Sequence, residues 1–444
     1  MRQSLRRQPA RLVPAAFLGV ITVGTLLLLL PISREGDAAA PFLTALFTAT
    51  SAVCVTGLIV VDTPSYWSGF GEGVIAVLIQ AGGFGIMTFA SLLGLLVAGR
   101  LGLRGKMLAQ AETKALDLGD VRGVVMRVGI ITLSVEFVVA VVLAARFKFE
   151  YGYAFGEALW LGVFHSISAF NNAGFALYPD SLMSFAKDPV IMLPISLAIV
   201  IGGIGFPVLV ELGRKIGNPA KWSIHTKITL VGTGLLLWAG FLGYLAFEWD
   251  NPDTMGPMSL GQKVHAALFA TVTARTAGFN GVDVGALNNQ TWLMTDVLMF
   301  IGGGSAGTAG GIKVTTFFLL AFVIWAEIRG EPDVPVFKRT VVGSAQRQAL
   351  TVALLGVGLV VAGTMTISTV TEHPLDQVLF EVTSAFATVG LSTGITAQLP
   401  ALGEVVLIAL MFTGRVGTIT VASSMALRHR RRAYRFPDER PIVG

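Results

Sequence analysis

Four glycines recur along the chain in a setting that suits an ion-binding backbone. Each closes a segment that begins with Phe and contains Ser or Thr followed by Ala, and the third copy is one residue shorter than the others. The intervals between the glycines are 117, 104 and 112 residues. Four matches at near-equal spacing indicate an internal repeat rather than chance. The segments are 47–57, 164–174, 269–278 and 380–390.

These segments could bind a dehydrated cation through backbone carbonyls. A ring of carbonyls replaces the hydration shell of the ion and presents no full countercharge that would trap it. Turning consecutive carbonyls toward one axis requires backbone angles that glycine adopts at little cost. A short helix before each glycine would direct its negative C-terminal end at the ion. The sequence therefore predicts a potassium-type filter formed by Val55, Thr56, Gly57, Asn172, Ala173, Gly174, Thr276, Ala277, Gly278, Thr388, Val389 and Gly390.

A second glycine motif follows each filter glycine after 24 to 28 residues. Gly82-Gly-Phe-Gly85 and Gly202-Gly-Ile-Gly205 share one pattern, and the third copy is a longer run over 302–311. Glycine weakens helices, so this run predicts an unwound loop inside an apolar segment. In the fourth copy Arg415 takes a glycine position. An arginine within a membrane segment is costly unless paired or hydrated, which makes it a functional candidate.

The elements that position these motifs are apolar and long enough to cross a bilayer. The chain has 444 residues, of which 53% are hydrophobic and 13% charged, with a mean hydropathy of +0.72. Soluble domains carry about 25% charged residues, so a membrane protein is predicted. A bilayer requires spans of about 20 residues. Eight such segments run approximately over 12–31, 71–98, 123–145, 189–212, 227–247, 292–326, 349–370 and 401–426.

The half-apolar filter segments are too short to span, and each lies between two predicted spans. Non-helical backbone at membrane depth is tolerated where it is buried in protein or lines a watery cavity. We therefore expect an all-α membrane protein with four helix–pore loop–helix units around one central pore. The predicted divisions are repeat 1 at 1–105, repeat 2 at 106–222, repeat 3 at 223–345, repeat 4 at 346–427 and a cytoplasmic tail at 428–444.

Charge in the connecting segments predicts the orientation of the chain. The net charge of +5 could suggest nucleic acid, but the basic residues gather in alternate connections, as the positive-inside rule requires. Both termini are therefore expected in the cytoplasm. The first apolar segment follows a basic stretch like that of a signal peptide. Its length of about 20 residues exceeds a signal core, so we interpret it as a retained span. The basic residues of these connections are Arg100, Arg104, Lys106, Arg214, Lys215, Lys221, Arg329, Lys338, Arg339, Arg347, Arg428, Arg430, Arg431 and Arg432.

The combined motifs resemble the Trk/Ktr/HKT superfamily of cation transporters. The stretches 273–279, 302–313 and 414–417 carry the resemblance, which extends over about residues 12–427. Eight spans are more similar to the KtrB type of membrane subunit than to TrkH. In this superfamily, glycine at all four filter positions implies potassium preference, whereas serine at the first is associated with sodium. The first position here is Gly57.

The resemblance also implies a gate and partners. In the superfamily the glycine-rich loop lies below the filter and obstructs the pore, with Arg415 facing the same region. The gate residues so implied are Gly302, Gly303, Gly304, Ser305, Ala306, Gly307, Thr308, Ala309, Gly310, Gly311, Lys313 and Arg415. The resemblance further implies a homodimer in membrane lipid on a cytosolic KtrA-type ring that binds ATP or ADP, with potassium as cargo and sodium as an activator. No organic cofactor and no nucleic acid are expected.

Other interpretations fit less well. A secondary transporter with broken helices would explain the glycines but predicts inverted halves, and a membrane enzyme would need convergent His, Asp or Glu inside the spans. The match of 302–307 to a dinucleotide motif lacks the surrounding βαβ unit. For Arg275 we expect a position behind the third filter, bonded to an acidic residue or to carbonyls. Asn171 and Asn172 would brace the second filter or contribute carbonyls, and His165 would be a hydrogen-bonded pore-helix residue. Cys54 would be inert, and the sequence does not place Glu136.

Overall fold

The protein is described by a computed structural model covering residues 12–36, 38–99 and 121–417. The regular secondary structure of this part is almost entirely helical, which confirms the predicted all-α membrane fold. The long helices are α2 Leu12–Leu28, α5 Gly69–Gly99, α7 Val121–Phe149, α9 Pro189–Ile204, α10 Phe206–Lys215, α11 Ile224–Glu248, α13 Asn289–Phe300, α14 Val314–Ile328, α15 Gly343–Ser368 and α17 Ala401–Phe412. Each filter segment begins inside a helix and continues past its end. These helices are α3 Phe42–Val53, α8 Phe155–Phe170, α12 Leu260–Thr273 and α16 Leu375–Ala387. Short helical turns include α4 Thr63–Tyr66, η2 Pro31–Ser33, η3 Met183–Phe185, η4 Pro219–Lys221, η5 Val284–Ala286, η6 Thr396–Gln398 and the π-helical η7 Thr413–Gly417.

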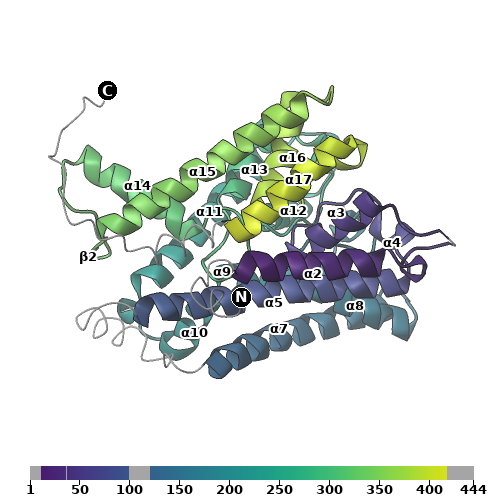
Figure 1. Cartoon of the computed structure of the whole chain (residues 1–444), viewed down its shortest axis with the longest axis horizontal. Helices are drawn as coiled ribbons and strands as arrows, with labels where there is room; N and C mark the ends of the chain where they lie inside the picture. The colour runs from purple at the N-terminus through teal and green to yellow at the C-terminus, as the bar shows by residue number, and fades with distance from the viewer. Residues whose placement is uncertain (1–11, 37, 100–120, 418–444) are drawn as a thin grey trace, which may run out of the picture.

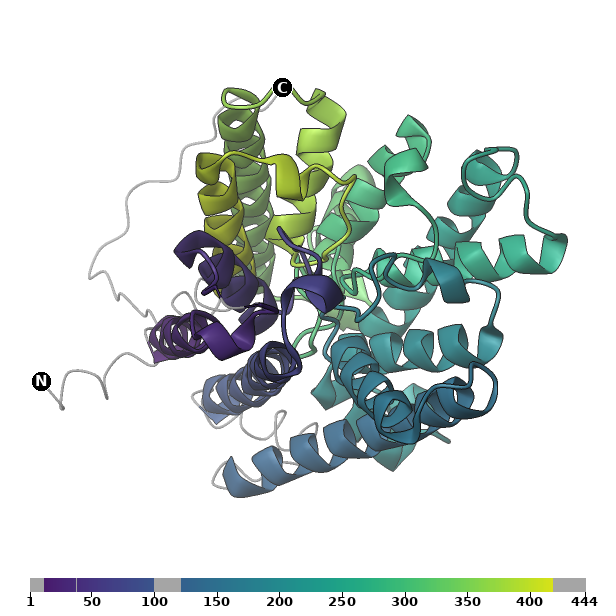
Figure 2. The same cartoon turned by 90° about the vertical axis from the view of Figure 1, so that its right-hand side faces the viewer.

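The helices are arranged in a closed circuit. Figure 1 shows α2, α5 and α7 side by side, and α15 crossing the opposite part of the molecule. In the view turned by 90°, the colour passes around the molecule from purple through teal to green and yellow (Figure 2). The N-terminal and C-terminal helices therefore adjoin, and α3 packs against α17. This circuit lets segments from the two ends of the sequence contribute to one site.

Within the described residues, four helices are long and apolar enough to cross a membrane, namely Gly69–Thr88, Gly123–Phe149, Ile224–Glu248 and Gly343–Ser368. The pair of α9 and α10 is apolar enough to count as a fifth span if the two helices are taken together, but they are bent by 98° at their junction. The sequence prediction treated 189–212 as one continuous span and missed this bend. The predicted sixth segment is divided into α13 and α14 by a loop, as the glycine run suggested. The eighth is helical to Phe412 and continues through η7, and its remainder from residue 418 lies outside the described residues.

Four further predicted features fall on parts of the chain that the structure does not describe. The basic cluster of Arg100, Arg104 and Lys106 and the division at 105–106 lie outside the described residues. The same holds for the division at 427–428 and for the basic tail.

Between α14 and α15 the chain forms a small hairpin from β1 Pro335–Val336 and β2 Arg339–Thr340. The strands are antiparallel, with Pro335 opposite Thr340.

Asp188 fixes the connection between α7 and α9. Its side chain accepts hydrogen bonds from Arg146 Nε at 2.8 Å, from Tyr151 Oη at 3.0 Å and from the backbone N–H of Val190 at 2.9 Å. Burial alone would raise the pKa of the Asp188 carboxyl, but these donors, Arg146 first among them, hold that pKa below its usual value. The carboxylate thus caps the start of α9 and joins it to the end of α7.

Candidate functional site

The four predicted filter strands share one backbone conformation. Each glycine has a positive φ, between +70° and +97°. The residue two positions before each glycine also has a positive φ, although it carries a side chain. Such angles are uncommon outside glycine and gather at functional sites. The same departure in all four repeats indicates a common purpose. These residues are Val55, Asn172, Thr276 and Thr388, with φ of 55°, 58°, 74° and 51°.

The four filter glycines form a closed ring. A Cβ atom built on Gly57 would lie 3.2 Å from the Cα of Gly174, and one on Gly174 would lie 3.0 Å from that of Gly278. The corresponding distance from Gly278 to Gly390 is 3.0 Å, and from Gly390 back to Gly57 it is 3.1 Å. Each such Cβ would also overlap a carbonyl oxygen of the next repeat, so a side chain could not enter without displacing it. The four oxygens belong to Ala173, Ala277, Val389 and Thr56, in the same order.

The Ser or Thr of the repeated motif holds the filter strand of its repeat by hydrogen bonds. In each repeat one filter N–H group donates to the backbone carbonyl of this Ser or Thr, at 2.8 to 2.9 Å. The pairs, donor first, are Thr56 with Ser51, Ala173 with Ser168, Ala277 with Thr273 and Val389 with Ser384. The hydroxyls of Ser51 and Ser384 also accept from the N–H of Gly57 and Gly390, each at 3.0 Å. The N–H groups therefore face the protein, which leaves the carbonyls of the same peptides free for the axis of the ring.

Charge and shape around the ring favour a cation. The helices α3, α8, α12 and α16 all end within five residues of their filter glycine, so their negative C-terminal ends converge on the ring. On one side of the ring lies a cavity of about 290 Å³ that all four glycines line. The carboxylates of Asp62 and Asp283 line the same cavity. An ion approaching from this side meets negative charge and then the carbonyl ring.

The second glycine motif packs the long helices against the filter segments. A Cβ on Gly82, Gly202 or Gly414 would overlap the carbonyl oxygen of Val53, Phe170 or Phe386, respectively. Each of these carbonyls lies at or next to the end of the filter helix of its own repeat. The glycine is needed because only a residue without a side chain permits this approach.

The predicted loop over 302–311 is hydrogen-bonded to the break between α9 and α10. Pro207 lacks an N–H group and cannot continue the helix through the carbonyl of Gly203. That carbonyl instead accepts from Gly304 N at 2.8 Å, and the carbonyl of Gly202 accepts from Thr308 N at 3.1 Å. Phe206 N in turn donates to the carbonyl of Ala306 at 3.2 Å. The groups freed by the break are thus satisfied by the loop.

The loop also touches the filter. Thr308 Oγ1 lies 2.8 Å from the side-chain amide of Asn172 and donates to the carbonyl of Phe170 at 3.2 Å. Opposite, Gly310 approaches the side chain of Thr388 so closely that a Cβ would overlap it. The neck of the loop is closed by a parallel bridge between Ile301 and Ile312. The loop therefore lies against the second and fourth filter strands.

Three cations bind carbonyls of this loop. Arg275 donates to the carbonyl of Gly302 at 2.6 Å, Lys313 donates to that of Ala309 at 2.6 Å, and Arg415 donates to that of Thr308. Both arginines are buried. Among the described residues, none of the three forms an ion pair with a carboxylate. For Arg275 the two predicted alternatives, an acidic residue or carbonyls, resolve to a carbonyl.

Glu136 lies behind the second filter strand, a position that the sequence did not reveal. Its carboxylate accepts from Asn171 Nδ2 at 3.0 Å and from Gln80 Nε2 at 3.2 Å. Asn171 Nδ2 also lies 2.8 Å from Gln80 Oε1. Asn171 therefore braces the second filter from behind, and Gly83 provides the space for its side chain.

His165 bonds the carbonyl of Leu161 and the N–H of Leu177 inside the protein, as expected for a pore-helix residue.

Sequence comparisons match the whole of this architecture. The family described as TrkH, cation transport protein, matches residues 7–434. Ktr system potassium uptake protein B of Bacillus subtilis is 39% identical over 440 residues, which are 99% of this chain and 98% of that protein. The protein of the same name from Vibrio alginolyticus is 38% identical over 98% of this chain and 94% of its own length.

Two further relatives extend the comparison. Potassium/sodium uptake protein NtpJ of Enterococcus hirae is 34% identical and covers all of this chain and 99% of its own length. The crystal structure of the potassium transporter TrkH from Vibrio parahaemolyticus superposes with a TM-score of 0.71. That match covers 94% of this chain and 84% of the other, at 19% identity, and so concerns the fold.

Proposed function

This chain belongs to the TrkH family of cation transport proteins, and from that premise we propose that it carries potassium ions across the cytoplasmic membrane. The ion passes through the ring of Gly57, Gly174, Gly278 and Gly390. The closure of this ring is the observation that carries the proposal. Relatives of 39% and 38% identity are potassium uptake proteins by name, which supports potassium as the ion. The protein is a transporter and not an enzyme.

The filter selects by replacing the hydration shell of the ion with carbonyl oxygens. Their spacing is set by glycine-to-carbonyl contacts between neighbouring repeats, which a side chain at any of the four glycines would widen. Filter contacts come from Val55, Thr56, Asn172, Ala173, Thr276, Ala277, Thr388 and Val389 together with the glycines. Sodium acts as an activator or second cargo, in keeping with the potassium/sodium uptake protein among the relatives.

The glycine-rich loop acts as the gate. It lies directly against two filter strands, and three cations fix its carbonyls. With the loop in this position the positive charges of Arg275, Lys313 and Arg415 oppose the passage of a cation. Opening requires the loop to leave the axis, and its small residues Gly302, Gly303, Gly304, Ser305, Ala306, Gly307, Thr308, Ala309, Gly310 and Gly311 permit that movement.

The end of the molecule that carries α10 and the β1–β2 hairpin faces the cytoplasm. The connections there carry Arg214, Lys215, Lys221 and Lys338, in agreement with the positive-inside rule. The cavity lined by Asp62 and Asp283 then opens to the outside, where it collects potassium. Both termini lie in the cytoplasm. The working unit is a homodimer in membrane lipid, controlled by a cytosolic KtrA-type ring that binds ATP or ADP.

The test is potassium uptake in a bacterium that lacks its own potassium uptake systems. Wild-type protein should restore growth at low potassium when its regulatory subunit is present. Gly57→Ser should admit more sodium, because the added side chain overlaps the carbonyl of Ala173. Arg415→Ala should raise the flux that remains when the regulatory subunit is absent. Gly73→Ala is the control, because a Cβ at Gly73 meets open space.

Two results would contradict the proposal. Absence of potassium uptake by the wild type with its regulatory subunit would remove the function itself. If Gly57→Ser behaves like Gly73→Ala, the ring of glycines does not select the ion. The secondary-transporter interpretation would then be the next to examine.

A further inference from the structure

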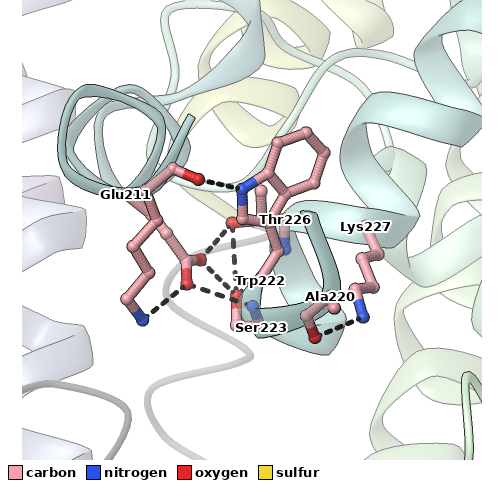
Figure 3. Close-up of polar contacts among 7 residues, drawn as sticks. Glu211, Ala220, Trp222, Ser223, Thr226 and Lys227 are labelled. Carbon is pink, nitrogen blue, oxygen red and sulfur yellow. Dashed lines mark hydrogen bonds and ion pairs between the residues drawn. The ribbon is translucent and has the colours of Figure 1, made fainter. Parts of the chain in front are cut away.

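Glu211 on α10 is the centre of a polar cluster that joins α10 to the beginning of α11 (Figure 3). Its Oε2 atom accepts from Ser223 Oγ at 2.7 Å and from Thr226 Oγ1 at 2.6 Å. Its Oε1 atom accepts from Ser223 N at 3.1 Å and pairs with Lys215 Nζ at 3.3 Å. The Glu211 side chain is 14% exposed. Both oxygens are therefore fully used, and three of the four bonds cross from one helix to the other.

Charge favours the cluster. The positive N-terminal end of α11 lies at Ser223, the residue that caps it, so the carboxylate is placed where a helix attracts an anion. Glu211 is also the one acidic residue in the segment 206–227, whose other charged residues are Arg214, Lys215, Lys221 and Lys227. No other carboxylate of this segment can replace it.

Both helices of the cluster lead to the loop. At the start of α10, Gly205 packs against the carbonyl of Ser305, and Phe206 N binds the carbonyl of Ala306. On α11, Thr229 lies one turn beyond Thr226, and its methyl group would meet a Cβ on Gly304 at 3.0 Å. Residues 304–306 of the loop thus lie between the two helices that Glu211 joins.

We infer that Glu211 is a positioning residue for the pore loop, and that the tie from Glu211 to Ser223 and Thr226 keeps the loop against the filter. The inference rests on the proposed function for its consequence, which is control of potassium flux. Movement of α10 away from α11 breaks this tie and withdraws Gly205 and Phe206 from the loop. A cytoplasmic partner that displaces α10 would therefore open the pore without contacting the loop.

The test measures the position of the loop directly. Ser305 is partly exposed, and a cysteine has nearly the same size as a serine. The rate at which a thiol reagent modifies Ser305→Cys therefore reports how accessible the loop is. The single native cysteine, Cys54, is fully buried, and the protein without Ser305→Cys gives the background. In purified full-length protein, Glu211→Ala should raise the rate on the order of tenfold, which corresponds to about 1.4 kcal/mol of coupling.

Two matched variants distinguish loss of the bonds between α10 and α11 from a general disturbance of α10. Thr226→Val removes one bond on the α11 side with little change of shape and should raise the modification rate by about threefold. Lys215→Ala removes the partner on the same helix as Glu211 and should leave the rate within about twofold of wild type. If Glu211→Ala fails to fold, Thr226→Val still tests whether the bonds of Glu211 to α11 position the loop.

Three outcomes decide the matter. Faster modification in Glu211→Ala and Thr226→Val, but not in Lys215→Ala, supports the inference. An unchanged rate in Thr226→Val and in folded Glu211→Ala overturns it. An equal increase in Lys215→Ala also overturns it, since the effect would then come from α10 itself. Because modification does not require transport, the result stands whether or not the wild type carries potassium, and uptake by the wild type tests the proposed function separately.

Discussion

The glycine at each filter position is required both by its own backbone angle and by the neighbouring repeat. A Cβ on Gly278 would overlap the carbonyl oxygen of Val389, which belongs to the fourth repeat, and the φ of Gly278 is +78°. Most side chains resist such a φ. The cost of a substitution therefore falls on the carbonyl spacing between two repeats.

Gly278→Ala should lower discrimination of potassium against sodium by about tenfold, equivalent to roughly 1.4 kcal/mol. The physical reason is that displacement of the Val389 carbonyl widens the ring, so that its oxygens replace the hydration shell of potassium less well and potassium loses part of its advantage over sodium. Competition of sodium with rubidium uptake measures the effect. Gly234→Ala, where the Cβ meets open space, serves as the control. Equal discrimination in both variants would show that the third repeat does not take part in selection.

At the scale of single residues, the repeated letters of the sequence identified four segments whose glycines adjoin in one ring in the structure. Ser51, Ser168, Thr273 and Ser384 were visible as a motif, but the bonds from Gly57 N and Gly390 N to the hydroxyls of Ser51 and Ser384 could be seen only in the structure. Glu136 could not be placed from sequence, since its partners Gln80 and Asn171 lie 56 and 35 residues away along the chain. Whether the predicted residues bind the ion stays a prediction.

Among the elements, the break between α9 and α10 was missed although a signal was present. Gly82-Gly-Phe-Gly85 stays inside the continuous helix α5, whereas the similar Gly202-Gly-Ile-Gly205 precedes a bend of 98°. The difference is Pro207, which has no counterpart two residues after Gly85. A proline there forbids the helical bond to Gly203. The loop prediction at 302–311 succeeded because six of these ten residues are glycine, twice the number in Gly82-Gly-Phe-Gly85, and each glycine weakens a helix.

The connection between α7 and α9 should be sensitive to acid through Asp188. Its pKa is lower in the folded protein than in the unfolded chain, where it is about 3.9. The ionised Asp188 therefore stabilises the fold at neutral pH, and this contribution is lost as pH falls through the folded value. Asp188→Asn should cost about 1–3 kcal/mol at pH 7.

Thermal unfolding at pH 7 and at pH 3 checks this expectation. The gap between wild type and Asp188→Asn should be wide at pH 7 and narrow at pH 3. Asp250→Asn, at an exposed position, should change stability little at either pH. A gap of constant size would mean that packing rather than the charge of Asp188 accounts for the loss.

On the scale of the whole molecule, the ion should be part of the folded structure. A cation bound in the ring contacts four repeats at once and has no such site in the unfolded chain. Binding to the folded state alone stabilises it, by about 2.7 kcal/mol at one hundred times the dissociation constant. Potassium should therefore raise the melting temperature of the purified protein by about 2 to 4 °C over choline.

The same measurement on variants identifies where the ion binds. Gly278→Ala should lose most of the increase, and Gly234→Ala should keep it. Stabilisation that is equal for potassium and choline in the wild type would indicate that the ring holds no ion in this state of the protein.

The closing contact of the ring, from Gly390 back to Thr56 and Gly57, has a consequence for how the protein is made. A ribosome delivers the first filter strand to the membrane long before the fourth has been synthesised. The first three filter strands therefore lack the neighbour that closes the ring until the fourth has been synthesised. Completion of the filter is then a late event of biogenesis, because both the closing contact of the ring and the packing of α17 against α3 join the first repeat to the last.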